Sequence, residues 1–358
     1  MEEKMERLKG WMDGRKNPPT TIELNITNRC NQRCLSCWQR SGNVGHDELP
    51  DEKWLDIVKE AGMLGVKELR LPGSGEPLAR KELVLRIIEE AVKHGMNGLL
   101  ITNGMLFDKA AVMVIVKSGW GNVTFSLDGP DATTHDYLRG TSGAFDAATK
   151  WIREFASVKK DIGAQSPLLR INTVLSNKNY DKLDKIMELA HDLGCGAVSL
   201  QPMTVFSAEG EKLRLSDEQI AQLPKSIEKA KRAAARHGIF TNVESFMSTE
   251  VVGKSNEMDN VIASRAGDAG PGSAVPPCLE PWYNIVITPD GIAGPCSMFG
   301  GAGGDILGSK SLSEVWYGET FEGIRRRLRA GKLFDFCKNC CVVVFEENAR
   351  IRRELANG

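Results

Sequence analysis

Residues 27–38 read TNRCNQRCLSCW, and this stretch places Cys30, Cys34 and Cys37 in a C-x3-C-x2-C spacing. A structural zinc site uses four ligands, and an ordinary cubane iron–sulfur cluster uses four cysteines. A set of three thiolates therefore leaves one corner of a metal cluster open for chemistry. The structural alternative is a zinc site in which His46 or a distant cysteine supplies the fourth ligand.

The composition is that of a globular protein with a sizeable core. The chain has 358 residues, of which 41% are hydrophobic and 26% charged. A net charge of -1 gives no basic surface for nucleic acid. The charged N-terminus lacks a signal peptide, and no apolar run reaches the roughly 18 residues of a membrane span. We therefore expect a cytoplasmic protein without nucleic-acid or membrane partners. In that reducing compartment, its nine cysteines are metal ligands rather than disulfides.

Short apolar runs alternate with amphipathic stretches along the first two thirds of the chain. The runs predict strands at 22–26, 68–71, 98–101, 122–127, 168–174 and 197–200. The stretches predict helices at 51–64, 80–94, 145–160, 183–193 and 217–237. Six strand–helix units indicate a parallel sheet with helices outside it. This pattern fits an open β/α barrel and a doubly wound sheet equally well.

The chain divides into a leader (1–20), the alternating region (21–240), a linker or mobile loop (241–277) and a cysteine-bearing module (278–358). In the module we expect a strand at 284–288, a hairpin turn at 289–291 and one helix at 312–329. Four cysteines of the module are candidate metal ligands: Cys278, Cys296, Cys337 and Cys340. Cys341 competes with Cys340 for the fourth position, and a structural zinc site is the alternative.

The three-cysteine loop resembles the cluster loop of the radical SAM superfamily, and further motifs follow in the family's order. They are PGSGEP at 72–77, ITNG at 101–104, SLDG at 126–129, RINT at 170–173 and QPM at 201–203. One departure is Ser36, where the family usually has an aromatic residue; Trp38 follows Cys37 instead. The resemblance implies a partial (β/α)6 TIM-like barrel at 21–240. It also implies a small α+β twitch domain, the shortened form of the SPASM domain, at 278–358.

The resemblance also implies cofactors. Cys30, Cys34 and Cys37 would hold a [4Fe-4S] cluster whose fourth iron chelates S-adenosylmethionine, and reductive cleavage would yield a 5'-deoxyadenosyl radical. The twitch cysteines would hold one auxiliary [4Fe-4S] cluster, an electron acceptor suited to an oxidation. A flavodoxin- or ferredoxin-type protein would supply the electron.

Several residues would line the S-adenosylmethionine site by the same resemblance. Gly75 and Glu76 would hold the amino group, although Glu76 at a helix start is also a common structural feature. Asn172, or less favourably Arg170, would contact the carboxylate or ribose. Asp128 would contact the ribose or cap its own turn. The remaining candidates are Trp38, Asn103, Ser126 and Gln201.

The sequence indicates the substrate less clearly than the cofactors. The spacing of the later cysteines resembles that of 2-deoxy-scyllo-inosamine dehydrogenases, which favours a radical SAM oxidoreductase acting on a small polyol. Peptide maturation, a redox-neutral reaction and a non-catalytic zinc- or cluster-binding protein are the alternatives. Asp136 and Tyr137 are weak candidates for a general base.

Two further features favour structural interpretations. The basic run at 325–329 is expected to form a solvated face or to contact acidic barrel helices, rather than to bind phosphate. Cys195, in a Gly-Cys-Gly turn, is expected to be a buried structural thiol.

Overall fold

A computed structural model describes residues 2–42, 44–45, 47–247, 275–299, 305–307, 310–340 and 342–356. Most of the expected linker, from residue 248 to 274, lies outside these ranges, as do His46 and Cys341. Before the gap, β7 (Phe240–Thr241) and a short 3-10 helix (Val243–Met247) extend ordered structure past the expected boundary at residue 240. The domain boundaries themselves stay predictions.

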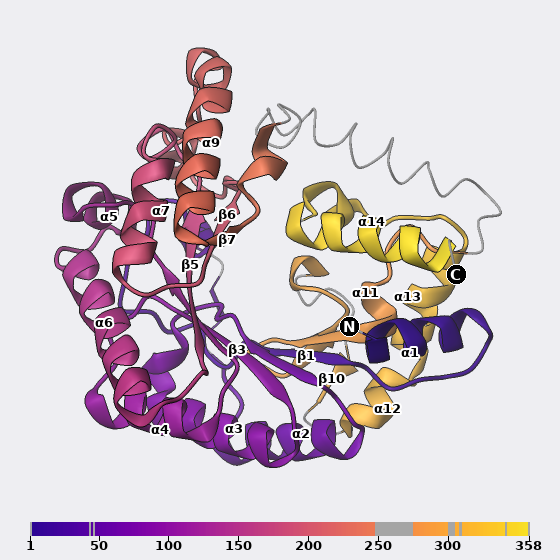
Figure 1. Ribbon diagram of the computed structural model, residues 1–358. Coiled ribbons are helices and arrows are strands. Elements are labelled where there is room, and N and C mark those ends of the chain that lie inside the picture. Colours follow the sequence, from indigo (N-terminus) through magenta and orange to yellow (C-terminus); the bar gives the residue numbers. More distant parts are fainter. Residues whose placement is uncertain are drawn as a thin grey trace.

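The centre of the molecule is a curved parallel sheet in which strands follow chain order (Figure 1). Its first six strands are β1 (Thr21–Leu24), β2 (Glu68–Leu71), β3 (Asn97–Thr102), β4 (Asn122–Ser126), β5 (Leu168–Val174) and β6 (Ala197–Gln201). A doubly wound sheet reverses its strand order near the middle, whereas this order runs continuously from β1 to β7. The fold is therefore the partial, TIM-like barrel.

Helices cover the outer face of the sheet, as Figure 1 shows. The larger ones are α2 (Asp51–Met63), α3 (Lys81–Lys93), α4 (Lys109–Ser118), α6 (Ala144–Ile162), α7 (Leu183–Asp192) and α9 (Asp217–His237). Local sequence sets their ends: Asp108 accepts the Ala111 N–H at the start of α4, and Ser216 with Gln219 forms a capping box on α9. Apolar side chains of these helices pack on the sheet and form one core.

The C-terminal module continues the barrel sheet instead of standing apart from it. β8 (Asn284–Ile287) pairs in parallel with β1, so that Glu23 lies beside Val286. β9 (Ile292–Gly294) returns antiparallel to β8, which confirms the expected hairpin turn, and β10 (Asp305–Ile306) follows it. The described strands form one ten-stranded sheet.

The single helix expected at 312–329 is wrong, because two helices occupy this segment. They are α12 (Leu312–Trp316) and α13 (Glu319–Arg329). Gly318 lies between them with an extended backbone and starts α13, which breaks the helical run.

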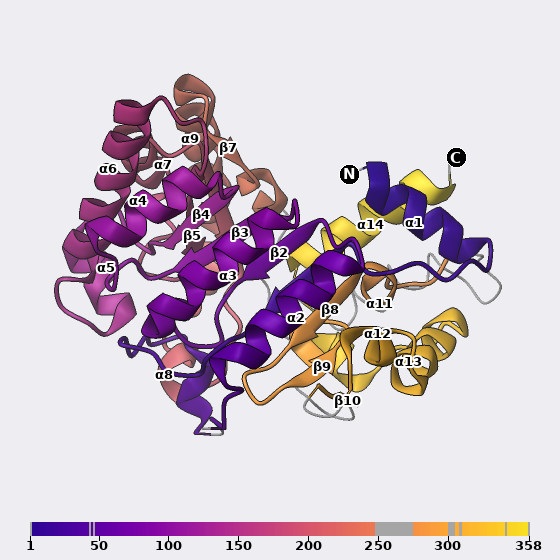
Figure 2. The same cartoon turned by 90° about the horizontal axis from the view of Figure 1, so that it is seen from below.

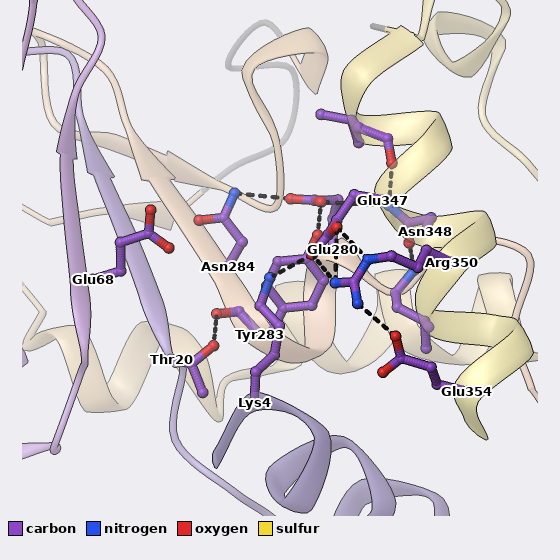
Figure 3. Close-up of polar contacts among 12 residues, drawn as sticks. Lys4, Thr20, Glu68, Glu280, Tyr283, Asn284, Glu347, Asn348, Arg350 and Glu354 are labelled. Carbon is purple, nitrogen blue, oxygen red and sulfur yellow. Dashed lines mark hydrogen bonds and ion pairs between the residues drawn. The ribbon is translucent and has the colours of Figure 1, made fainter. Parts of the chain in front are cut away.

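The two ends of the chain meet beside the module (Figure 2). α1 (Glu2–Met12) lies next to α14 (Val342–Ala356), and Lys4 pairs with Glu347 at 3.4 Å. Figure 3 shows the buried junction around Glu280 of α11 (Glu280–Tyr283). The Glu280 carboxylate accepts hydrogen bonds from Tyr283, from Asn284 at 2.9 Å and from Asn348 at 3.4 Å. Burial raises the pKa of this carboxyl.

Arg325 contradicts the expectation of a solvated basic face. Its guanidinium is fully buried and donates to the carbonyl oxygens of Pro281 at 2.8 Å and Trp316 at 2.9 Å. Its central carbon lies 4.5 Å from the Trp11 ring and 4.4 Å from the Trp316 ring. Burial lowers the pKa of Arg325 to about 10. Arg325 thus joins α1, α11, α12 and α13.

No helix within the described ranges is both long enough and apolar enough to cross a lipid bilayer.

We predict that Arg325→Lys lowers the free energy of unfolding by about 2–4 kcal/mol, because an ammonium cannot replace a stacked guanidinium that serves two buried carbonyls. Arg326→Lys is the matched control, since Arg326 is an exposed neighbour on the same helix. Urea unfolding of the anaerobically purified proteins measures the difference. Equal unfolding midpoints for the two variants would contradict this role of Arg325.

Candidate functional site

The three-cysteine loop follows β1 at the carboxyl edge of the sheet. Cys30, Cys34 and Cys37 are each partly buried, and the Cys37 N–H donates to the Cys34 carbonyl at 3.2 Å. Burial raises the pKa of the Cys30 and Cys37 thiols, so they need a nearby positive charge, such as that of bound iron, to become thiolates. Among the described residues, no three His, Cys, Asp or Glu side chains gather closely enough to hold a single metal ion. The donor set fits a cluster in which each cysteine binds a different iron.

The end of α5 (Ala132–Arg139) supports this loop. The Leu35 N–H donates to the Leu138 carbonyl at 2.9 Å, and Arg139 Nη1 lies 3.8 Å from Cys34 Sγ. Gly140 has a positive φ of 58°, and a Cβ there would overlap the Arg33 carbonyl oxygen. Only glycine allows both this backbone conformation and this close approach.

Asp128 is bound on both carboxylate oxygens by protein groups. Oδ2 pairs with Arg139 at 2.9 Å, and Oδ1 accepts the Val174 N–H at 2.8 Å. Its N–H donates to Nδ1 of His135, a completely buried histidine. Burial, with the Arg139 charge second, lowers the pKa of His135 to about 3. In this structure Asp128 joins β4, β5 and α5, and its predicted contact with the ribose stays a prediction.

Glu76 holds the end of β2 against the end of β3. The carboxylate is 2% exposed and accepts from Thr102 Oγ1 at 2.6 Å, the Asn103 N–H at 2.7 Å and the Leu78 N–H at 3.1 Å. Burial raises its pKa. The Gly75 N–H donates to the Thr27 carbonyl at 2.9 Å, so the predicted ammonium-binding segment is fixed directly against the cluster loop.

The structure places the other predicted cofactor residues at the same edge of the sheet. Ser126 and Asn172 are register partners on β4 and β5, and Gln201 ends β6. The Asn103 side chain donates to Asn31 of the cluster loop at 2.8 Å. Trp38 Nε1 donates to the Ser74 carbonyl at 3.2 Å. Their contacts with S-adenosylmethionine stay predictions.

The cysteines of the C-terminal module come from three separate segments. Burial raises the pKa of the Cys278 thiol and brings that of Cys296 to about 12; Cys296 and Cys340 are close enough to Cys278 to raise its pKa further. The Cys340 N–H donates to the Cys337 carbonyl at 3.1 Å. Three rings, Phe299, Phe334 and Phe336, pack together next to these segments. Four partly buried thiols beside a group of aromatic rings suit a fully ligated cluster.

The two candidates for a general base lie outside the cavity described below. The Asp136 carboxylate caps α6 by accepting the N–H groups of Gly143 at 2.7 Å and Phe145 at 2.8 Å. Tyr137 is 53% exposed. Cys195 is buried, and burial raises its pKa to about 12, in line with its expected structural position.

A cavity of about 670 Å³ is lined by residues of both the barrel and the C-terminal module. It extends from Trp38, next to Cys37, to Cys296. Glu23 and Asn25 of the β1 segment line it, and so does Ser297. Its volume lies within the range of small-molecule sites. Sequence reasoning missed Glu23, because one charged residue inside an apolar strand gives no pattern. It also did not predict that Arg139 lies beside Cys34 and pairs with Asp128, although that residue directly precedes a glycine, a common helix-end signal.

Residues 24–190 match the radical SAM superfamily, and residues 278–341 match the SPASM family, an iron-sulfur cluster-binding domain. An AdoMet-dependent heme synthase of Methanosarcina barkeri is 33% identical over 182 residues, which cover 51% of this chain and 50% of the relative. A PqqA peptide cyclase of Granulibacter bethesdensis is 28% identical over 222 residues, which cover 60% of this chain and 56% of the relative. The chain therefore spans about half the length of these relatives.

Among solved structures, Streptococcus suis SuiB bound to the precursor peptide SuiA superimposes with a TM-score of 0.66. The two are 19% identical, and the match covers 93% of this chain and 73% of that one. This likeness supports the arrangement of barrel and C-terminal module.

We predict that Gly140→Ala displaces the three-cysteine loop, because the new Cβ overlaps the Arg33 carbonyl. Iron per chain after anaerobic reconstitution should fall from about eight to about four. Gly143→Ala is the matched control: it also has a positive φ, at 76°, but no atom lies within 4 Å of its added Cβ. An iron assay with electron paramagnetic resonance measures the result. A Gly140 variant that still binds about eight irons per chain would show that the cluster loop does not require glycine at this position.

We also predict a pH effect from His135. The folded state lowers its pKa below the unfolded value near 6.5, so the unfolded state binds more protons in acid. The stability that this neutral histidine contributes is complete above pH 6.5 and is lost as pH falls toward 3. By pH 5.5 the loss should be about 1 kcal/mol.

Urea unfolding of the metal-free protein at pH 7.5 and 5.5 measures this effect. His135→Asn, which keeps an acceptor for the Asp128 N–H, should reduce the difference between the two pH values. His191→Asn, at an exposed histidine, should leave it as in the wild type. If His135→Asn unfolds with the wild-type pH dependence, the buried imidazole is not its source.

Proposed function

We propose, from the premise that this chain belongs to the radical SAM superfamily and carries a SPASM-type iron–sulfur domain, that it oxidises a peptide substrate held in the cavity between its two cysteine sets. The single observation that carries the proposal is the position of this cavity. One end is next to Cys37, and the other end is lined by Cys296.

The barrel residues would hold and orient the first cofactor pair. Cys30, Cys34 and Cys37 would bind a [4Fe-4S] cluster, which supplies the electron that cleaves S-adenosylmethionine to the 5'-deoxyadenosyl radical. Arg139 places a positive charge beside Cys34 and is itself held by Asp128. Glu76 fixes the loop that would face the methionine part of S-adenosylmethionine. These residues thus position the reaction at the cavity end near Trp38.

The C-terminal module would provide an electron acceptor at the opposite end. Cys278, Cys296, Cys337 and Cys340 would ligate an auxiliary [4Fe-4S] cluster with no open iron, a suitable acceptor for the electron left on the substrate. Phe299, Phe334 and Phe336 pack against one another next to these cysteines. An acceptor placed across the cavity from the site of radical formation favours net oxidation over a redox-neutral outcome.

A peptide fits the cavity better than the small polyol that the cysteine spacing suggested. The cavity reaches exposed residues at its edge, including Asp47, Phe206 and Asp290, so a longer chain can enter from solvent. The relative named as a PqqA peptide cyclase adds support from sequence. No contact in the cavity favours a polyol specifically, and polyol oxidation stays a prediction from spacing alone.

Anaerobically reconstituted protein should convert S-adenosylmethionine to 5'-deoxyadenosine under dithionite. With short peptides encoded beside its gene, mass spectrometry should detect a product that has lost two hydrogen atoms. Cys30→Ala should abolish cleavage, whereas Cys337→Ala should lower peptide oxidation far more than cleavage.

Two results would contradict the proposal. Cleavage that persists in Cys30→Ala would show that the first cluster lies elsewhere. Peptide oxidation that persists in Cys337→Ala would show that the second cysteine set is not the electron acceptor.

A further inference from the structure

The cavity between the two cysteine sets has a one-sided charge. Three acidic residues line it, and they are Glu23, Asp47 and Asp290. Among the described residues that line it there is no lysine, arginine or histidine. Asp47 and Asp290 are exposed at the edge of the cavity, whereas Glu23 is 8% exposed at its floor. A cation that approaches from solvent therefore meets increasingly buried negative charge.

Glu23 lines the cavity, and one of its two carboxylate oxygens has no hydrogen bond from the described residues by distance and angle. Ser297 Oγ donates to Oε1 at 2.7 Å, and this is the only hydrogen bond that the described residues give the carboxylate by distance and angle. Burial raises the pKa of Glu23, while the Ser297 hydroxyl, the Arg70 charge and the Asn25 amide act in the opposite direction. A buried carboxylate with a free oxygen is costly unless a donor or cation completes it.

The nearest basic residue by register is already paired elsewhere. Arg70 lies beside Glu23 across the β1–β2 pairing. Its guanidinium binds Glu68 through both carboxylate oxygens, at 2.8 Å and 3.1 Å. This bidentate geometry uses the Nε–Nη2 edge of the guanidinium on Glu68. The Arg70 charge still lowers the pKa of Glu23, but among the described residues no hydrogen bond joins Arg70 to the Glu23 carboxylate.

A second acceptor in the same cavity also lacks a partner. Asn28 Oδ1 is buried and accepts no hydrogen bond from the part of the chain that the structure describes, while Asn28 Nδ2 donates to the Gly45 carbonyl at 2.8 Å. Asn28 and Glu23 both line the cavity. Glu23 Oε2 and Asn28 Oδ1 are both hydrogen-bond acceptors, so a ligand that binds them must supply a donor.

We propose that this cavity binds a primary ammonium group of the substrate, with Glu23 Oε2 as its ion-pair partner. The inference rests on the proposed function in one respect, namely that the cavity is the substrate site. An ammonium suits the position better than a guanidinium, because only one carboxylate oxygen is available and a guanidinium prefers two. A lysine side chain and an amino sugar both present this ammonium group.

Matched neutral and charged probes test this inference by binding rather than turnover. The holoenzyme with both clusters and saturating S-adenosylmethionine is titrated calorimetrically with N-acetyl-lysine amide and with N-acetyl-norleucine amide, which lacks the charge. A second pair, glucosamine and glucose, distinguishes the amino-sugar source. The charged member of at least one pair should bind at least tenfold more tightly. Glu23→Gln should reduce that preference to less than about threefold.

Controls separate loss of the site from loss of the fold. Glu23→Gln conserves shape, and its iron content and circular dichroism should match those of the wild type. Asp290→Asn, at the exposed edge, should retain most of the preference for the charged probe. If Glu23→Gln alters the cofactor loading, Glu23→Asp provides the second test: its shorter carboxylate keeps the charge and should retain a reduced preference.

Three outcomes would overturn the inference. Equal binding within both probe pairs would show that the cavity does not select a cation. A preference that survives Glu23→Gln would place the selecting group elsewhere. A lower affinity for S-adenosylmethionine in Glu23→Gln, together with equal binding of the two members of each probe pair, would assign Glu23 to the sulfonium cofactor. A charged-probe preference without any peptide product would leave this inference intact and refute the peptide substrate.

Discussion

The parallel pairing of β1 with β8 is the constraint on which the rest of the molecule depends. β1 leads directly into the loop of Cys30, Cys34 and Cys37, and β8 follows Cys278 by six residues. The backbone ladder between these strands therefore ties the two cysteine sets to one sheet. It also places Glu23, on β1, within reach of Ser297, which follows β9. Cavity, cluster loop and module are all positioned by the same hydrogen bonds.

Buried carboxylates link neighbouring strands at the carboxyl edge of this sheet. Glu76 joins β2 to β3, and Asp128 joins β4 to β5 and, through Arg139, to the cluster loop. Each carboxylate satisfies N–H groups that a strand leaves unpaired where it ends. Family resemblance assigned both residues to S-adenosylmethionine, and the structure shows in addition what they do for the protein. A substitution at either position would therefore disturb the sheet edge as well as any bound cofactor.

The alternation of strands and helices was predictable because its signals are local, whereas the choice of a barrel over a doubly wound sheet came from the family resemblance. Six apolar strands and the intervening amphipathic helices appear near the expected residues, and the hairpin turn at 289–291 is present. The pairing of β8 with β1 was not predictable, since it joins residues more than 260 positions apart and each strand reads as an ordinary apolar run. Arg325 was misjudged for a related reason: a basic run on a helix looks solvated until distant aromatic residues such as Trp11 enclose one of its members. At the site, cysteine spacing predicted the cluster ligands, but Glu23 could be recognised only once the cavity around it was known.

The shared sheet also bears on how the protein would choose its substrate. Cys278 and Cys296 flank β8 and β9, and Cys30 follows β1, so the two ends of the cavity belong to adjacent strands. Separating these ends would require breaking the β1–β8 ladder, whose hydrogen bonds lie in the core. Closure by a hinge between barrel and module is therefore an expensive route to selectivity. Selection falls instead to the fixed side chains that line the cavity, and the buried one with a charge is Glu23. A rigid cavity with a single buried carboxylate discriminates by charge first and by shape second.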